Sequence, residues 1–407
     1  MTIEAGEARI AWAQAQMPVL AALGERFRAE RALDGLRVGA CLHVTAETAV
    51  LARTLAAGGA SVALCAANPL ATQDEVVEAL QADEAIAVHA RHGETIEELG
   101  GHVADVLDTA PQVTLDDGAD LLVTLHGARP DLLGGLIGST EETSTGLARL
   151  RAMEADGQLR TAVLAVNEAR AERVFNDHYG TAQSTLDGIL RATNLLLAGR
   201  TVVVLGYGAT GRGIAHRARG AGAQVIVCEV DPVAALDARM EGYEVMPSLD
   251  AAARGDIFIT VTGAPGVLGA PHFERMKDGA VLANAGHFDV EIDLQALAAG
   301  GAGPVPVRPL VDQYTLDRGR KLNLLASGRV VNLAAGEGHP ASVMDLSFAL
   351  QALSVQHLAC EEPRMAPGVH AVPASIDEEV ARLKLASLGV EVDTLTGAQQ
   401  DYLRRWR

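Results

Sequence analysis

The sequence is poor in aromatic residues and in positive charge. Phe, Trp and Tyr make up only 3% of its 407 residues, whereas apolar residues of all kinds make up 49%. A core must therefore be built mainly from Ala, Val and Leu, and the chain is long enough for two or three domains. The formal net charge of −19 argues against nucleic acid or an anionic membrane as partner, because like charges repel. Small-molecule substrates fit this composition better.

Cysteine and long apolar runs are scarce as well. None of the cysteines lies in a Cys-x-x-Cys pair or at a metal-ligand spacing, so the sequence predicts neither disulfides nor a metal site. No run reaches the roughly 18 apolar residues of a membrane span, and the early acidic residues Glu4 and Glu7 exclude a signal peptide. We expect a cytoplasmic protein. The four cysteines are Cys41, Cys65, Cys228 and Cys360.

Short apolar segments alternate with amphipathic segments along most of the chain. This alternation is typical of an α/β fold with parallel sheets. It stops near residue 183 and resumes near residue 199, which indicates two domains of the same class. The expected strands are residues 37–43, 61–65, 85–90 and 121–125 in the first domain, and residues 201–205, 224–227, 257–261 and 280–284 in the second.

A glycine-rich turn follows the expected strand 201–205. Gly206 permits a tight turn, Gly208 lets a pyrophosphate approach the backbone, and Gly211 lets the next helix pack closely on the strand. The N-terminus of that helix would face the phosphates. The turn therefore predicts a dinucleotide site, although similar turns also occur as plain helix caps. Its predicted cofactor-binding residues are Gly206, Gly208, Ala209, Thr210 and Gly211.

An acidic residue ends the next expected strand. Glu229 lies 21 residues after Gly208, where its carboxylate can accept hydrogen bonds from a ribose diol and repel a 2′-phosphate. The position favours NAD over NADP. Asp231 lies close by, but Pro232 follows it, so we interpret Asp231 as a helix cap.

Six polar motifs lie outside the glycine turn. They are CLHVTAETAV (41–50), NPLATQD (68–74), LDDG (115–118), EETSTG (141–146), NAGHFDVEID (284–293) and GHP (338–340). Together they resemble the S-adenosyl-L-homocysteine hydrolase family, in its short form, from about residue 8 to the end. The resemblance implies tightly held NAD that oxidises the 3′-hydroxyl of a nucleoside. Elimination at C5′ then becomes possible, and the stored hydride reduces the ketone again.

The resemblance also implies roles for the matched residues. His43 and Asp117 would handle the C5′ leaving group and the water, and Glu142 would bind the sugar hydroxyls. His287 is expected at the seam between the domains. On sequence alone, His43 could equally be a packed histidine and Asp117 part of a turn. The residues expected to bind substrate are Thr45, Glu47, Thr72, Gln73 and His339, and those expected to line the nicotinamide nucleotide are Thr143, Ser144, Thr145, Glu229, Asn284 and Asn332.

One segment departs from the family pattern. After V-N-D the family carries a lysine and then F-D-N, whereas residues 166–177 here read VNEARAERVFND. Aligned without a gap, Glu172 takes the place of the lysine, Asn176 that of the aspartate and Asp177 that of the asparagine. Glu172 can act as a base, but it cannot supply positive charge to an oxyanion. We include all three residues among the catalytic candidates.

This departure leaves three functions open. The main prediction is a nucleoside dehydratase of a secondary-metabolite pathway, which would remove water across C4′–C5′ of an adenine nucleoside. The first alternative is a true S-adenosyl-L-homocysteine hydrolase that releases adenosine and homocysteine. The second is a regulator that binds NAD and a nucleoside without catalysis.

The resemblance finally suggests how the chain is organised. Residues 1–182, completed by 339–385, are expected to form a substrate-binding α/β domain, and residues 183–338 an NAD-binding Rossmann-like domain. Residues 386–407 are expected to form a helical tail that joins subunits. We expect a homotetramer or a homodimer.

Overall fold

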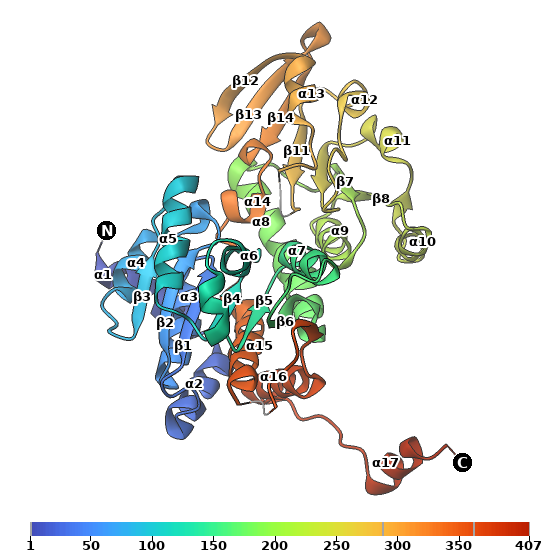
Figure 1. Cartoon of the computed structure of the whole chain (residues 1–407). Helices are drawn as coiled ribbons and strands as arrows, with labels where there is room; N and C mark the ends of the chain where they lie inside the picture. Colours follow the sequence, from blue (N-terminus) through green and yellow to red (C-terminus); the bar gives the residue numbers. More distant parts are fainter. Residues whose placement is uncertain (1, 287–288, 361–362, 407) are drawn as a thin grey trace.

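The computed structural model describes residues 2–286, 289–360 and 363–406, and it contains two β-sheets flanked by helices (Figure 1). The first sheet has seven parallel strands in the order β15-β6-β5-β4-β1-β2-β3. The strand order reverses between β1 and β4, where a crevice for ligands is expected at the carboxyl ends of the strands. The strands are β1 (Arg37–Leu42), β2 (Ser61–Ala66), β3 (Ile86–His89), β4 (Val113–Asp116), β5 (Gly138–Glu141), β6 (Ala162–Ala165) and β15 (Gly368–Ala371).

Helices from both ends of the chain cover this sheet. The long helix α15 packs against α2, α3 and β5 and buries most of its side chains. The C-terminal part of the chain thus completes the first core. The helices of this part are α1 (Ile3–Gln14), α2 (Pro18–Glu30), α3 (Ala46–Ala57), α4 (Asp74–Leu80), α5 (Ile96–Asp108), α6 (Asp120–Gly127), α7 (Ser144–Ala155), α15 (Ala341–Cys360) and α16 (Ala374–Ser387), with short 3₁₀ turns at Pro69–Ala71, Pro130–Gly135 and Val166–Glu168.

The segment 121–125, which we expected to be a strand, lies instead within helix α6. The strand of this region is β4, four residues long and nearer the N-terminus. Asp116, at the end of β4, accepts hydrogen bonds from the backbone N–H groups of Leu121 and Leu122 (2.9 and 3.1 Å), which helps to fix the start of the helix. Periodicity alone cannot tell a buried helix from a strand in so short an apolar run.

The second sheet contains six parallel strands in the order β9-β8-β7-β10-β11-β14, which is the 3-2-1-4-5-6 order of a Rossmann fold. Two antiparallel strands, β13 and β12, extend its edge beyond β14. The expected α/β class with two Rossmann-like sheets is therefore confirmed. The strands are β7 (Thr201–Leu205), β8 (Gln224–Cys228), β9 (Glu244–Val245), β10 (Ile257–Thr260), β11 (Ala280–Asn284), β12 (Gly301–Arg308), β13 (Val311–Leu316) and β14 (Lys321–Leu325).

The helices around the second sheet are short apart from α8 and α9. They are α8 (Ala182–Thr193), α9 (Ala209–Gly220), α10 (Pro232–Met240), α11 (Ser248–Ala252), α12 (Ala270–Phe273), α13 (Leu294–Ala299) and α14 (Val331–Ala334), with 3₁₀ turns at Asp317–Gly319 and Ala326–Gly328.

One continuous helix links the two sheets. It starts at Arg170, runs as a π-helix, η4, over Glu172–Thr181, and continues without a break into α8. The boundary that we expected between residues 182 and 183 falls inside this helix. Its wide segment packs against α15 on one side and α9 on the other.

The chain ends in helix α17 (Gly397–Arg404), which projects away from the rest of the molecule (Figure 1). The helix is capped by Thr396, whose side chain accepts a hydrogen bond from the N–H of Gln399. Its side chains Tyr402 and Leu403 are exposed. The expected helical tail is therefore present. Across the described residues, none of the helices combines the length and apolar character needed to span a membrane.

Candidate active site

A cavity of about 520 Å³ lies between the two sheets. Its walls include the loops after β1, β4 and β5, the π-helix, and the start of α9. Most of the residues that we predicted for the site line it. These are His43, Thr45, Glu47, Asp117, Glu142, Thr143, Ser144, Thr145, Glu172, Asn176, Asp177, Thr210, Asn332 and His339.

His43, His339 and Asp117 lie close together in the wall of the cavity. His43 Nε2 lies 3.2 Å from Asp117 Oδ2, and the other polar atoms of these two side chains, His43 Nδ1 and Asp117 Oδ1, are buried without a partner in the described structure. His339 lies near them, and its Nε2 is 3.0 Å from the hydroxyl of Thr181. Burial, reinforced by His43, lowers the pKa of His339 to about 4. His339 is therefore neutral at pH 7.

The π-helix turns four polar side chains toward the same cavity. A π-helix has i to i+5 hydrogen bonds and a wider turn than an α-helix, so residues four and five positions apart share a face. Glu172, Asn176, Asp177 and Thr181 have this spacing, and all four line the cavity. In an α-helix the same four residues would spread over about half of the circumference.

Three carboxyl groups, those of Glu142, Glu172 and Asp177, line the cavity at the π-helix. Burial, together with the charge of Glu172, raises the pKa of Glu142 well above its usual range. Burial also raises the pKa of Glu172 to about 8 and that of Asp177 to about 6, while Ser347 and Asn176 beside Glu172 act in the opposite direction. Within the described residues, no lysine or arginine lines this cavity. Burial therefore favours the protonated form of Glu142 and Glu172 more than it is favoured in an exposed carboxyl group.

Sequence reasoning did not select Glu141, which joins two predicted site residues. Glu141 is fully buried and accepts hydrogen bonds from the N–H of Gly118 (3.0 Å) and from the N–H and hydroxyl of Thr143 (2.9 and 2.8 Å). Gly118 follows Asp117, and Thr143 caps helix α7 through the N–H of Gly146. Glu141 thus fixes the Asp117 turn relative to α7. The doubled glutamate at the end of β5 was the available signal.

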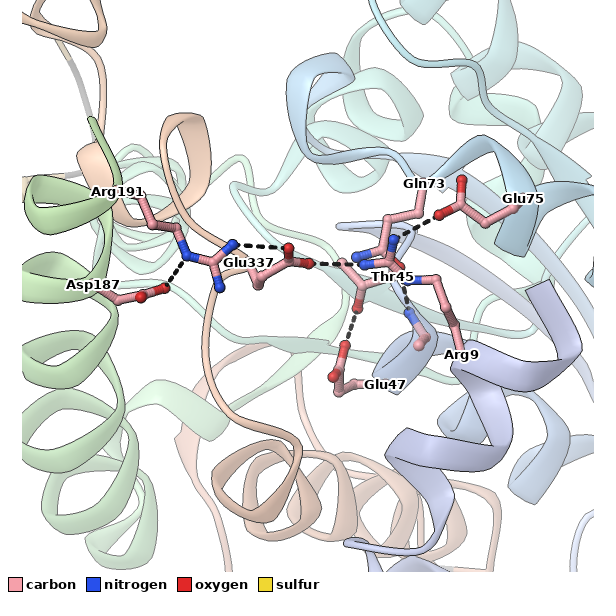
Figure 2. A network of polar contacts seen from close by, with 9 residues as sticks. Arg9, Thr45, Glu47, Gln73, Glu75, Asp187, Arg191 and Glu337 are labelled. Carbon is pink, nitrogen blue, oxygen red and sulfur yellow. Dashed lines mark hydrogen bonds and ion pairs between the residues drawn. The ribbon is translucent and has the colours of Figure 1, made fainter. Parts of the chain in front are cut away.

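Thr45 and Glu47, two of the residues expected to hold the base, line the same cavity, and we call this part of it the base end; Figure 2 shows both residues beside Gln73. The hydroxyl of Thr45 donates a 2.7 Å hydrogen bond to Glu47, and burial raises the pKa of Glu47. Gln73 accepts a 3.1 Å hydrogen bond from the N–H of Ala46 and so holds the start of α3. Thr72 and Gln73 line a smaller neighbouring cavity of about 300 Å³ together with Thr45.

An ion-pair network borders this end (Figure 2). Glu337 lies between Arg9 of α1 (2.8 Å) and Arg191 of α8 (3.0 Å), and Arg9 also contacts Glu75 at 2.6 Å. Because Glu337 stands two residues before His339, these contacts tie the loop that carries His339 to both parts of the molecule. The pairs are largely exposed, so each contributes little stability.

The glycine turn has the geometry that a dinucleotide requires. Gly206 has φ +107°, and a Cβ on Gly211 would lie 2.1 Å from the carbonyl oxygen of Gly206, so helix and strand contact each other directly. A Cβ on Gly208 would meet no atom within 4 Å. The space above Gly208, at the N-terminus of α9, is therefore open to a pyrophosphate.

Two acidic residues end β8 as expected. Glu229 accepts hydrogen bonds from the N–H groups of Tyr207 and Val230 (both 2.6 Å) and of Asp231 (3.0 Å), and its Oε2, bound only by Tyr207, can accept one more, as from a ribose. Asp231 accepts hydrogen bonds from Val233 N and Ala234 N, which confirms that it caps α10.

The remaining predicted residues occupy different surroundings. Asn284 is buried behind the cavity wall, where its amide bonds to Gly286 and Gly328. Asn332 donates to Ser184 (3.3 Å), and its buried oxygen has no partner in the described structure. His287 lies outside the described residues. The described part of the chain holds no group of three or more His, Cys, Asp or Glu side chains able to bind a metal ion.

Comparison with known proteins identifies the chain's relatives. Two family models match it: S-adenosyl-L-homocysteine hydrolase over residues 1–131, and the NAD binding domain of S-adenosyl-L-homocysteine hydrolase over residues 177–338. The adenosylhomocysteinase of Gloeobacter violaceus is 51% identical over 98% of this chain and 94% of its own length. The chain belongs to the S-adenosyl-L-homocysteine hydrolase family. Its cofactor is NAD.

Relatives within the S-adenosyl-L-homocysteine hydrolase family carry two different names. The S-inosyl-L-homocysteine hydrolase of Methanopyrus kandleri is 52% identical over 98% of this chain and 95% of that protein. The adenosylhomocysteinase of Aquifex aeolicus is 53% identical over 99% and 96%. Overall identity therefore does not decide between an adenine and a hypoxanthine base.

A solved structure outside the S-adenosyl-L-homocysteine hydrolase family shares the fold. The A chain of dipicolinate synthase from Bacillus subtilis matches 81% of this chain and 99% of its own length, with a TM-score of 0.51 and 14% sequence identity. At this identity the match shows the two-sheet architecture alone.

Proposed function

We propose that this family member hydrolyses an S-nucleosyl-L-homocysteine, with S-adenosyl-L-homocysteine as its substrate. The observation that carries the proposal is a single cavity that holds both the His43–Asp117 pair and residues next to the glycine turn. Relatives about half identical to the chain over almost its full length are named hydrolases. They support this alternative better than the dehydratase that we predicted first.

The carboxyl groups at the π-helix would bind the sugar hydroxyls and exchange protons with them. Bound NAD would supply the reversible removal of a hydride from C3′. Burial and mutual repulsion disfavour two neighbouring carboxylates, so a single proton shared by Glu142 and Glu172 would let one carboxyl donate a hydrogen bond to the sugar while the other accepts the 3′-hydroxyl proton. A pKa near 8 suits Glu172 as this base.

The His43–Asp117 pair would serve the C5′ position. A proton held between His43 Nε2 and Asp117 Oδ2 can be given to the leaving sulfur, and the same pair can then take a proton from the water that adds. Neutral His339 and Thr181 beside the pair can orient that water by hydrogen bonds.

The base end favours adenine over hypoxanthine. An ionised Glu47 only accepts hydrogen bonds, so it matches the 6-amino group of adenine and opposes the 6-oxo group of hypoxanthine. The hydroxyl of Thr45, which donates to Glu47, supports the ionised form against the effect of burial.

Loss of water from an adenine nucleoside is a second candidate function. It is favoured by the carboxylate of Glu172 at the position where the family pattern has a lysine, since this change alters the sugar end and leaves the His43–Asp117 pair in place. The same pair would then protonate a departing hydroxyl instead of a thiolate.

Mass spectrometry separates these functions. The purified holoenzyme would be incubated with S-adenosyl-L-homocysteine, adenosine and sugar-modified adenine nucleosides. Release of homocysteine supports the proposal. A product lighter by one water, without homocysteine release, overturns it in favour of the dehydratase. Retained NAD without any turnover would indicate the regulator.

The substitution Glu172→Lys adds a sharper comparison. If Glu172 is the base of a working sugar site, this change lowers native turnover. Faster homocysteine release by the variant would mean that the native carboxylate impairs hydrolysis and does not serve it.

A further inference from the structure

The helix that carries the sugar-facing carboxyls is capped by a residue far away in the sequence. Asp377, on α16, accepts hydrogen bonds from the N–H of Arg170 through Oδ2 (2.8 Å) and from the N–H of Ala171 through Oδ1 (2.9 Å). These are the first two N–H groups of the helix, which have no partner within it. The negative charge of a carboxylate also interacts favourably with the positive, N-terminal end of the helix dipole.

The residues next to the helix start cannot replace this cap. The preceding residue, Ala169, has extended backbone angles (φ −58°, ψ 145°) and no polar side chain. Position 169 would normally be filled by Ser, Thr, Asp or Asn. The cap must therefore come from another element, and Asp377 supplies it.

The helix that carries Asp377 is itself anchored in the core. Lys384, also on α16, pairs with the buried carboxylate of Asp345 on α15 at 2.9 Å. Asp345 in turn accepts hydrogen bonds from the N–H groups of Val19 and Leu20 (3.2 and 2.9 Å). Asp377 is therefore held on a fixed support.

We propose that Asp377 is a positioning residue that fixes the start of the π-helix, so that Glu172 and Asn176 face the sugar. Asp377 binds the N–H groups of both Arg170 and Ala171, so it sets where the first turn of this helix begins and how it is oriented. Glu172 directly follows Ala171. Loss of the cap would therefore turn the side chain of Glu172 relative to Glu142. The catalytic part of this proposal rests on the proposed function; the positioning itself does not.

Asp377 also contributes to the electrostatic surroundings of Glu172. The acidic groups that face Glu172 are Glu142 from the turn after β5, Asp177 from its own helix and Asp377 from α16. Each makes ionisation of Glu172 harder. Removal of the charge at residue 377 should therefore make Glu172 a stronger acid.

Hydrogen exchange of the holoenzyme tests the positioning without any assumed substrate. The test variant is Asp377→Ala, and the matched control is Glu378→Ala, which removes a carboxylate from the next residue of α16, where it contacts only Arg382 among the described ion pairs. We expect at least about tenfold faster exchange of the amides of residues 170–177 in Asp377→Ala, and no change there in the control. Equal exchange in both variants would overturn the proposal.

The pH profile of turnover then tests the link to Glu172. In Asp377→Asn one acceptor oxygen remains and the charge is lost, so the acidic limb of kcat/KM should move to lower pH while bound NAD is unchanged. In Asp377→Ala we expect kcat to fall by at least about tenfold with little change in KM. Two results together would show that Asp377 has only a structural role. The acidic limb of kcat/KM would not move in Asp377→Asn, and the lower kcat of Asp377→Ala would be explained by a smaller amount of folded enzyme. If the wild type turns over no nucleoside, the proposed function fails, and the exchange experiment still decides the positioning.

Discussion

His43 Nε2 lies 3.2 Å from Asp117 Oδ2 although the two residues are 74 positions apart in the sequence. They meet because β1 and β4 are neighbours at the point where the order of the first sheet reverses. Each residue follows the carboxyl end of its strand. The pair is thus a product of sheet topology, and its chemistry can be tested without disturbing the fold.

The substitution Asp117→Asn should remove the proton-sharing partner of His43 and keep the shape of the turn. We expect turnover to fall by on the order of 10²–10⁴, because an amide cannot take the proton. NAD content and Tm should stay at wild-type values, since the turn is held through Gly118 and Glu141. Turnover above one tenth of the wild-type rate would rule out this role.

Glu172 is predicted to cost stability at alkaline pH. Its pKa rises from 4.5 to about 8 on folding, so the folded state binds the proton more tightly and stability falls as pH rises through this interval. Glu172→Gln should therefore raise Tm by a few degrees at pH 9 and change it little at pH 4, while turnover is lost. Thermal unfolding of the apoenzyme at both values checks this. An equal effect at both pH values would contradict the assigned cause.

Gly208 and Gly211 should respond differently to the same substitution. Gly208→Ala meets no atom of the protein and Gly208 has a φ of −71°, so we expect normal folding with loss of NAD. Gly211→Ala places a methyl group 2.1 Å from the Gly206 carbonyl oxygen, so both Tm and NAD content should fall. Cofactor content after gel filtration and Tm without cofactor distinguish the two. A full NAD complement in Gly208→Ala would contradict the placement of the pyrophosphate.

Glu47→Gln should relax the choice of base. The amide can donate to the 6-oxo group of hypoxanthine, which the carboxylate cannot. We expect the ratio of kcat/KM for the adenine and hypoxanthine forms of the substrate to fall by about tenfold or more, with unchanged NAD content. An unchanged ratio would place the 6-position of the base elsewhere.

Much of the fold could be predicted because its signals are local. The strands around the glycine turn are continuous apolar runs, and Gly206, Gly208 and Gly211 mark the turn directly. The strands β4 and β5 were not predicted because buried polar residues, such as Asp116 in β4 and Glu141 in β5, interrupt their apolar pattern. The antiparallel strand β12 is exposed along its whole length and contains Pro304 and Pro306, so it lacks a buried apolar pattern.

The sequence predicted only those site residues that belong to a short, continuous motif. Motif resemblance led to His43, Asp117 and Glu142, and the structure brings all three to one cavity. Asp377 could not be found in this way, because it contacts Ala171 across 206 residues. The π-helix was not predicted either, because apolar periodicity distinguishes an α-helix from a strand and does not reveal a π-helix.

Because one continuous helix runs from Arg170 into α8, the number of residues in this helix determines how the two sheets are oriented relative to each other. Each residue of an α-helix turns the chain by roughly 100°, so deletion of one residue between the capped start and α8 would rotate the second sheet about the helix axis and withdraw the glycine turn from His43 and Asp117. The wide π segment therefore acts as a spacer of fixed length. A substitution in this segment keeps its length, whereas an insertion or a deletion changes the rotation between its two ends.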